Sequence, residues 1–459
     1  MASMSSYLDF KQQSHEVKIS WSPKKSKDIS TYTANISKLR DALASAKDIM
    51  EPYFRQYDKK KGKGKTVKSY NLFANITSYM DPLFGMGAIV AKRYGNPHTT
   101  NAGLKMMELM TLYDLIKDTT DTKSINTIKA LKSYSARKKR AQFMLFENGA
   151  LPGSGIIIAY YYVFTQMPIS FRSKYYWMAS SYISDVTQNT FKGVGTLGDK
   201  YGLLKNYPSH WLFKAPDNKG NKSDYNGDMT DMVVVEEAVR RLRQAGGVDM
   251  YMSDGAIHVS KSQYNKQEIV NIKLFIGEAY VALASMNKGS NMVIKIFTIF
   301  EDHTIALIVA LAERFNKFYI SKPRSSKADN SELYLVGIGY KAEGDTATIG
   351  VLNKMATIIR SQHPLKEETI VDLKYLSTNT WQSLINIMKL TSNEVIHHIN
   401  KRITLFKEIE KLGSEDKMIA AARKHQMKYN PFKQHWAKEM NLKSMRYDNK
   451  LKLYKDRRN

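Results

Sequence analysis

Short apolar runs alternate with amphipathic stretches through the middle of the chain, from about residue 90 to 345. Apolar residues at helical spacing predict helices over Leu104–Lys117, Ile156–Phe164, Thr230–Gln244, Gln263–Met286 and His303–Phe315. Apolar and aromatic runs predict strands over Gln142–Phe146, Tyr176–Ser180, Val248–Ser253, Asn291–Phe297, Phe318–Ser321 and Glu332–Tyr340. This alternation favours an α/β fold with a mostly parallel, doubly wound sheet. Because only a short loop joins the last two strands, the final strand should be antiparallel.

Two basic segments flank this central region. Residues 1–88 are expected to form an N-terminal extension, in which lysines gather among glycines in an exposed loop, Asp58–Lys68. Residues 346–459 are expected to form a helical C-terminal extension, whose tail Lys417–Asn459 mixes Lys and Arg with aromatic residues. The predicted organisation is therefore three parts, with the central domain at residues 89–345.

The charge balance narrows the class of partner. A formal net charge of +27 attracts polyanions, of which nucleic acid is the first candidate and an anionic membrane surface the second. A basic protein without a polyanion partner is the alternative. The lack of cysteine excludes disulfides, thiolate zinc sites and thiol catalysis. The longest apolar run, Gly155–Phe164, is shorter than the ~20 residues of a membrane span, and Met1–Ser20 lacks the apolar region of a secretory signal. We therefore expect a soluble protein.

One loop and three charged side chains are candidates for chemistry. The small residues of Glu147–Gly155 suit a close approach of backbone to a ligand, although this segment alone is better explained as an ordinary strand-to-helix turn. Asp254 follows a strand, at the end where doubly wound sheets bind ligands. Lys295 interrupts an apolar strand, so it needs a carboxylate partner or a function unless it lies on the solvent face of an edge strand. Glu332 opens the final strand.

Taken together, these motifs resemble the FtsJ family of ribose 2′-O-methyltransferases in both order and spacing. The matching segments are Leu104–Leu109, Glu147–Ser154, Ser253–Ala256, Val293–Phe297, Lys322–Ser326 and Ser331–Tyr334. The resemblance covers roughly residues 95–342. It looks closest to members from large cytoplasmic DNA viruses, through the segments Trp177–Ser181, Asp224–Asp228 and Tyr264–Glu268.

The resemblance implies a Rossmann-like methyltransferase sheet and a tetrad of two lysines and two carboxylates, formed by Lys105, Asp254, Lys295 and Glu332. In this scheme Lys295 accepts the proton of a ribose hydroxyl. Lys105, as a nearby like charge, would lower the pKa of Lys295, and the two carboxylates would orient the lysines.

The same resemblance implies S-adenosylmethionine as the cofactor and no metal. The expected cofactor contacts are Glu147, Gly149, Pro152, Gly153, Asp228 and Asp254. The expected RNA contacts are Lys322, Arg324 and Lys327. Two departures from the family pattern bear on the cofactor. Ser154 replaces a glycine, and Ser180-Ser181 stands where an acidic residue often holds the cofactor ribose.

The implied substrate is RNA, with the first transcribed nucleotide of 5′-capped messenger RNA favoured by the viral resemblance. Other capping or transcription subunits are possible partners, a membrane is not, and the expected location is cytoplasmic, including a viral factory or virion. The alternatives are a ribosomal or transfer RNA 2′-O-methyltransferase and a non-catalytic RNA-binding subunit of a capping complex. A dinucleotide-dependent oxidoreductase would require Gly-x-Gly-x-x-Gly after the first strand, which the loop at Gly149 does not supply.

Overall fold

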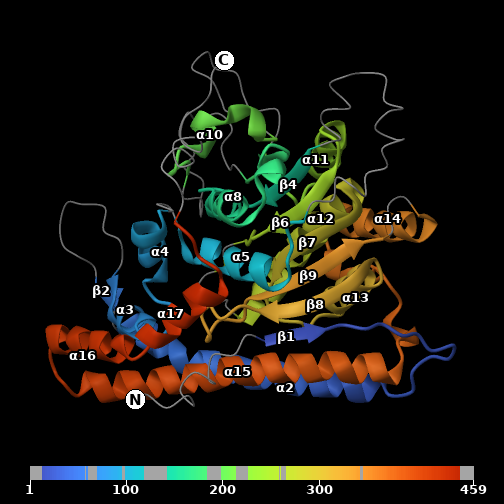
Figure 1. Ribbon diagram of the computed structural model, residues 1–459. Helices are drawn as coiled ribbons and strands as arrows, with labels where there is room; N and C mark the ends of the chain where they lie inside the picture. The colour runs from blue at the N-terminus through green and yellow to red at the C-terminus, as the bar shows by residue number, and fades with distance from the viewer. Residues whose placement is uncertain are drawn as a thin grey trace.

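The computed structural model describes residues 13–56, 58–59, 70–95, 99–117, 142–182, 198–212, 226–257, 259, 265–341 and 345–444 (Figure 1). Most of the lysine-rich loop at 58–68 and the end of the basic tail, with Tyr447 and Tyr454, lie outside these residues. Asp224, Tyr225 and Tyr264, which contributed to the viral resemblance, also lie outside them.

The core of the fold is a seven-stranded sheet in the order β1-β8-β9-β7-β6-β4-β5. Its strands are β1 (Gln13–Glu16), β4 (Phe143–Asn148), β5 (Tyr175–Ala179), β6 (Val248–Ser253), β7 (Met286–Ile296), β8 (Phe315–Lys322) and β9 (Leu333–Tyr340). Strands β5, β4, β6 and β7 are parallel, whereas β9 runs antiparallel to both β7 and β8. The α/β fold and the antiparallel last strand predicted from the sequence are confirmed. A separate ribbon pairs β2 (Asp58–Lys59) with β3 (Tyr70–Asn71).

Two groups of helices pack around the sheet (Figure 1). The first group is α5 (Asn101–Leu112) and α8 (Ser154–Gln166), and the second is α11 (Met232–Gln244), α12 (Gln267–Ser285), α13 (Asp302–Ala312) and α14 (Thr346–Arg360). From β4 the chain moves outward through α8 to β5, and it then moves back through α11 to β6. Because such crossovers are right-handed, the reversal places α8 and α11 on opposite faces. The sheet is therefore doubly wound, with its switch point between β4 and β6.

The flanking segments pack closely on this core. Helix α2 (Ile29–Gln56) lies along α15 (Thr378–Glu410), so the N-terminal and C-terminal parts run side by side (Figure 1). The remaining elements are α3 (Leu72–Ser78), α4 (Met86–Tyr94), α9 (Ile169–Arg172), α10 (Leu203–Asn206), α16 (Glu415–Met427), α17 (Asn430–Glu439) and 3₁₀ turns at Pro208–His210, Pro364–Lys366 and Leu373–Tyr375. The division at 88/89 and 345/346 stays a prediction.

The packing nevertheless crosses both predicted boundaries. Strand β1 extends the sheet beside β8, and α14 packs on α12. The amphipathic and apolar faces of these elements are thus buried in one continuous hydrophobic core. Among the described helices, none is both long and apolar enough to cross a membrane.

Candidate active site

The four predicted tetrad residues come together beside the carboxyl ends of β6 and β7. Asp254 directly follows β6, Lys295 lies near the end of β7, and Glu332 directly precedes β9. The antiparallel pairing of β7 with β9 sets Lys295 opposite Tyr334, which brings Glu332 close to Lys295. Lys105 reaches the cluster from α5.

Two short ion pairs organise this cluster. Lys105 Nζ donates a hydrogen bond of 2.7 Å to Glu332 Oε1. Lys295 Nζ lies 3.2 Å from Asp254 Oδ1 and donates a hydrogen bond of 2.6 Å to the Asp254 carbonyl oxygen. Lys105, Lys295 and Glu332 are buried, with exposed fractions of 8%, 7% and 8%. Lys295 is therefore a buried lysine with a carboxylate partner, and not a lysine on a solvent-exposed edge strand.

The Tyr334 hydroxyl links the two pairs. Its oxygen lies 3.0 Å from both Asp254 Oδ1 and Glu332 Oε1, so its single proton can be donated to either carboxylate. Ser326 Oγ donates a further hydrogen bond of 3.0 Å to Glu332 Oε1. Tyr334 was not predicted as a site residue. It lies two residues after Glu332, and this spacing puts the two side chains on one face of a strand, which is the signal that could have identified it.

Lys105, the lysine of α5, is held in its protonated form by the neighbouring carboxylates. Burial opposes protonation of Lys105, but the negative charges of Asp254 and Glu332 outweigh it and raise the pKa of Lys105 above its usual value. Burial likewise acts to raise the pKa of Glu332, yet Lys105 and Lys295 bring this pKa down to about 2. The Lys105–Glu332 pair is thus ionised at neutral pH. Burial first, and then the two carboxylates, raise the pKa of Tyr334 well above its usual value, so the hydroxyl stays a proton donor.

A cavity of about 680 Å³ opens beside the tetrad, at the carboxyl ends of β4, β5 and β6. Of the predicted cofactor contacts, Gly149, Asp228 and Asp254 line it. Asp254 therefore belongs both to the tetrad and to the cavity wall. Gly149 has a φ of 66°, and a Cβ at this position would lie 2.9 Å from the backbone of Gly255. The ends of β4 and β6 can approach this closely because both positions are glycine.

The other predicted cofactor contacts shape the loop after β4 from behind the cavity wall. Glu147 Oε2 accepts a hydrogen bond of 2.8 Å from the Ile156 amide at the start of α8. Burial, with the charge of Asp254 second, raises the pKa of Glu147 to about 8. Gly153, with a φ of 100°, packs so closely on Leu203 that a side chain would collide with it. Pro152 is buried in the same loop.

The serines that depart from the family pattern have identifiable partners. Ser154 Oγ accepts a hydrogen bond of 2.6 Å from Thr100 Oγ1, so it joins the start of α8 to the start of α5 instead of lining the cavity. Ser181 does line the cavity, where its Oγ accepts a hydrogen bond of 3.4 Å from the Leu151 amide. Ser154 is therefore not part of the cavity wall.

Two polar residues of the cavity were missed from the sequence. Asn148 Nδ2 donates a hydrogen bond of 2.9 Å to Glu278 Oε1. Asn148 Oδ1 and Glu278 Oε2 are both buried, and neither accepts a hydrogen bond from any described residue. Burial raises the pKa of Glu278 to about 7, partly countered by Ser253, Asn148 and Lys295. The available signal was a lone glutamate in the apolar stretch of α12.

The three predicted RNA contacts differ in their surroundings. Lys322 is buried and donates a hydrogen bond of 2.6 Å to the Asn330 carbonyl, and burial lowers its pKa to about 8. Arg324 pairs with Glu108 at 3.1 Å and with Glu439 at 2.8 Å. Only Lys327 is exposed. Lys322 and Arg324 thus fix the loop that carries Glu332, and an RNA contact by any of the three residues stays a prediction.

No metal site is visible in the described part of the chain, where no group of three His, Asp or Glu side chains is arranged to hold an ion. The lysines and carboxylates of this site can transfer protons and stabilise charge, next to a cavity of the size of small-molecule sites.

The doubly wound sheet with a cavity at its switch point and an antiparallel last strand is a Rossmann-like arrangement, which binds small ligands at that point. Residues 204–340, which include Asp254, Lys295 and Glu332, match the model of the FtsJ-like methyltransferase family. Over these residues the chain is similar to FtsJ-like methyltransferases. Methyltransferases of this family generally depend on S-adenosylmethionine.

Similar proteins come from viruses and from an insect. A protein of African swine fever virus named "Probable methyltransferase EP424R" is 34% identical over 264 residues, which are 57% of this chain and 54% of that protein. Cap-specific mRNA (nucleoside-2′-O-)-methyltransferase of Autographa californica nuclear polyhedrosis virus is 34% identical over 25% of this chain and 42% of its own. Cap-specific mRNA (nucleoside-2′-O-)-methyltransferase 2 of Drosophila melanogaster is 32% identical over 28% of this chain and 18% of its own. The match thus spans about half the length of the swine fever virus relative.

Proposed function

We propose that this protein is an S-adenosylmethionine-dependent RNA ribose 2′-O-methyltransferase that acts on the first transcribed nucleotide of capped messenger RNA. The observation that carries the proposal is the buried cluster of Lys105, Asp254, Lys295 and Glu332 at the edge of a cavity that shares Asp254 with it. The insect and baculovirus relatives are named as cap-specific mRNA methyltransferases, which supports the cap as the feature that the enzyme recognises.

The cavity fits the proposed cofactor in size and in donor set. Its volume of about 680 Å³ lies within the ~300–1,000 Å³ of small-molecule sites. Asp228 offers carboxylate oxygens for hydroxyl groups, and the unpartnered Oε2 of Glu278 and Oδ1 of Asn148 are buried acceptors for an amino group or a hydroxyl group. Phe297 and Leu274 supply apolar walls. When bound, S-adenosylmethionine supplies a methyl group activated by a positively charged sulfur.

Lys295 is the proposed general base. Lys295 Nζ would accept the proton of the ribose 2′-hydroxyl during methyl transfer, after releasing its own proton to solvent. The Asp254 carbonyl and carboxylate hold that nitrogen in place and stabilise the ammonium that forms. Lys105, kept charged by Glu332, provides a fixed positive charge that stabilises a developing oxyanion.

A matched set of short RNAs tests this function. Labelled S-adenosylmethionine is offered with a capped, guanine-methylated RNA, with its uncapped copy, and with a capped copy that carries a 2′-deoxy first nucleotide. We expect label on the first nucleotide of the capped RNA alone. Label on the uncapped copy as well would contradict cap dependence. Label on the deoxy copy would contradict the assigned ribose, and no label on any RNA despite cofactor binding would contradict the proposed substrate.

A further inference from the structure

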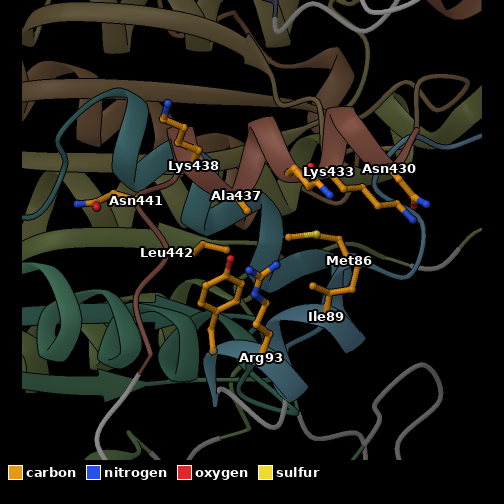
Figure 2. Close-up of a pocket in the computed structure, with 11 residues that line it drawn as sticks. Met86, Ile89, Arg93, Asn430, Lys433, Ala437, Lys438, Asn441 and Leu442 are labelled. Atoms are coloured by element: carbon orange, nitrogen blue, oxygen red, sulfur yellow. The ribbon is translucent and has the colours of Figure 1, made fainter. Parts of the chain in front are cut away.

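A second large cavity lies between α4 and α17, away from the sheet switch point. It has a volume of about 630 Å³, and we call it the α4–α17 groove (Figure 2). Its polar lining consists of three cations and three carboxamides: Arg93, Lys433, Lys438, Asn430, Gln434 and Asn441. Figure 2 shows Arg93 rising from α4 toward the side chains of α17. The groove therefore lies between α4, which spans the predicted boundary at 88/89, and the C-terminal extension.

The charge in this groove is uncompensated. None of the described residues that line it carries a carboxylate, so Arg93, Lys433 and Lys438 give it a net positive charge. Lys433 is only 9% exposed, and no partner for its ammonium is found among the described residues. Burial lowers the pKa of Lys433, because a desolvated ammonium without a counterion is less stable than in water. An anion bound in the groove would stabilise the charged form of Lys433.

The remaining lining favours a nucleotide chain over a simple anion. Carboxamides and a guanidinium donate hydrogen bonds to phosphate and to base edges. Tyr94 adds an aromatic ring, with the Arg93 guanidinium 5.7 Å from its centre, and Met86, Ile89 and Leu442 add apolar surface. Cations interleaved with an aromatic ring are the arrangement that binds single-stranded nucleic acid.

The groove is also fixed to the proposed active site through the other face of α17. Trp436 Nε1 donates a hydrogen bond of 3.2 Å to Glu108 Oε2 on α5, three residues after Lys105. Glu439 pairs with Arg324 at 2.8 Å, in the loop that leads to Glu332. Helix α17 thus carries the groove on one side and contacts the elements of the tetrad on the other.

We propose that the α4–α17 groove binds a single-stranded segment of the substrate RNA through its phosphates, while another nucleotide of the same strand occupies the tetrad. This inference rests on the proposed function, because RNA is the polyanion that such a methyltransferase must hold. The groove adds affinity for the strand beyond the reacting nucleotide, so it favours longer RNAs over short ones.

The test replaces Arg93 and Lys438, which are exposed, by glutamine in one double variant of the full chain. Binding of a labelled single-stranded RNA of about 20 nucleotides is measured over a range of salt concentrations. Each lost phosphate contact lowers the salt slope of log K by about 0.7, so we expect a slope lower by about 1.4 and an affinity reduced on the order of tenfold near 0.1 M salt. Lys389→Gln with Lys407→Gln on the exposed surface of α15 is the matched control, and we expect little change from it.

Two further readouts separate this inference from the proposed function. The groove variant should keep the affinity for S-adenosylhomocysteine, and it should lose more methyl transfer on the 20-nucleotide RNA than on a trinucleotide. Lys433→Met removes the third ammonium of the groove and should weaken RNA binding as well. RNA affinity and salt slope equal to those of the control variant would overturn the inference, even if methyl transfer is confirmed. The same measurement is made with poly-glutamate in place of RNA. If the groove variant loses as much affinity for poly-glutamate as for RNA, RNA is not the specific ligand of the groove.

Discussion

At the residue scale, the tetrad is held together by a hydroxyl that is not itself charged. Tyr334 Oη is close enough to share its proton between Asp254 and Glu332, and these carboxylates bind Lys295 and Lys105 respectively. The orientation of each lysine therefore depends on both carboxylates. A rigid arrangement of this kind keeps the reacting groups in place without cost at the moment of reaction.

The pH dependence of cofactor binding should depend on Glu278, which lines the cavity and has a pKa raised to about 7. Below that pH its carboxyl is neutral, and above it the group is an anion. S-adenosylmethionine carries one more positive charge than S-adenosylhomocysteine, so the affinity ratio of the two should rise from pH 6 to pH 8. Unlike charges in such a site contribute on the order of 1–2 kcal/mol.

Isothermal titration of both ligands at pH 6, 7 and 8 measures this ratio. In Glu278→Gln the contribution of Glu278 is absent, while any titration of the ligands themselves remains. We expect a flatter ratio in that variant. An identical pH profile in the wild type and in Glu278→Gln would refute the role of this carboxylate.

The charged tetrad residues could be predicted from the sequence because they follow or interrupt apolar strands and match a spaced family pattern. The partners that fix them could not. Tyr334 looked like one of many aromatic strand residues, and Glu278 reaches the cavity only because α12 packs beside β6. The expectation that Lys105 lowers the pKa of Lys295 is not tested, while the structure shows Lys105 itself tied to Glu332.

At the element scale, the long helix α15 clamps the loop between β8 and β9. Arg402, which is buried on α15, pairs with Asp329 in that loop at 3.0 Å and with Asp81 after α3 at 2.8 Å. Burial acts to lower the pKa of Arg402, but the two aspartates outweigh it. The C-terminal helix therefore supports the segment that positions Glu332.

Replacing Arg402 by methionine should destabilise the fold by about 3–5 kcal/mol near neutral pH, because two buried carboxylates lose their counterion. Burial already raises the pKa of Asp81, and loss of Arg402 should raise it further, so protonation relieves the repulsion at low pH. The destabilisation should accordingly grow from pH 5 to pH 8. Urea unfolding at both pH values measures it.

Lys407→Met, on the exposed side of the same helix, is the control for this measurement. Exposed substitutions usually change stability by less than about 0.5 kcal/mol. A loss of stability in Arg402→Met that is no greater than in this control, at either pH, would show that the clamp contributes nothing.

At the scale of the whole molecule, the alternation of strands and helices was enough to predict the doubly wound sheet, because buried parallel strands such as β4 and β6 are mostly apolar. The contribution of the flanking segments was not predictable. The polar strand β1 gives no apolar signal, yet it extends the sheet beside β8. The pairing of α2 with α15 joins residues far apart in the chain, which no local pattern encodes.

The most direct test of the account is methyl transfer to capped RNA by Lys295→Arg and Lys295→Met, with S-adenosylhomocysteine affinity measured in parallel. Arginine keeps the positive charge but cannot be deprotonated, so it cannot accept the hydroxyl proton. The account predicts that both variants bind the ligand and lose methyl transfer by about 10²–10⁴-fold. Transfer within a few-fold of the wild type in either variant would contradict Lys295 as the general base.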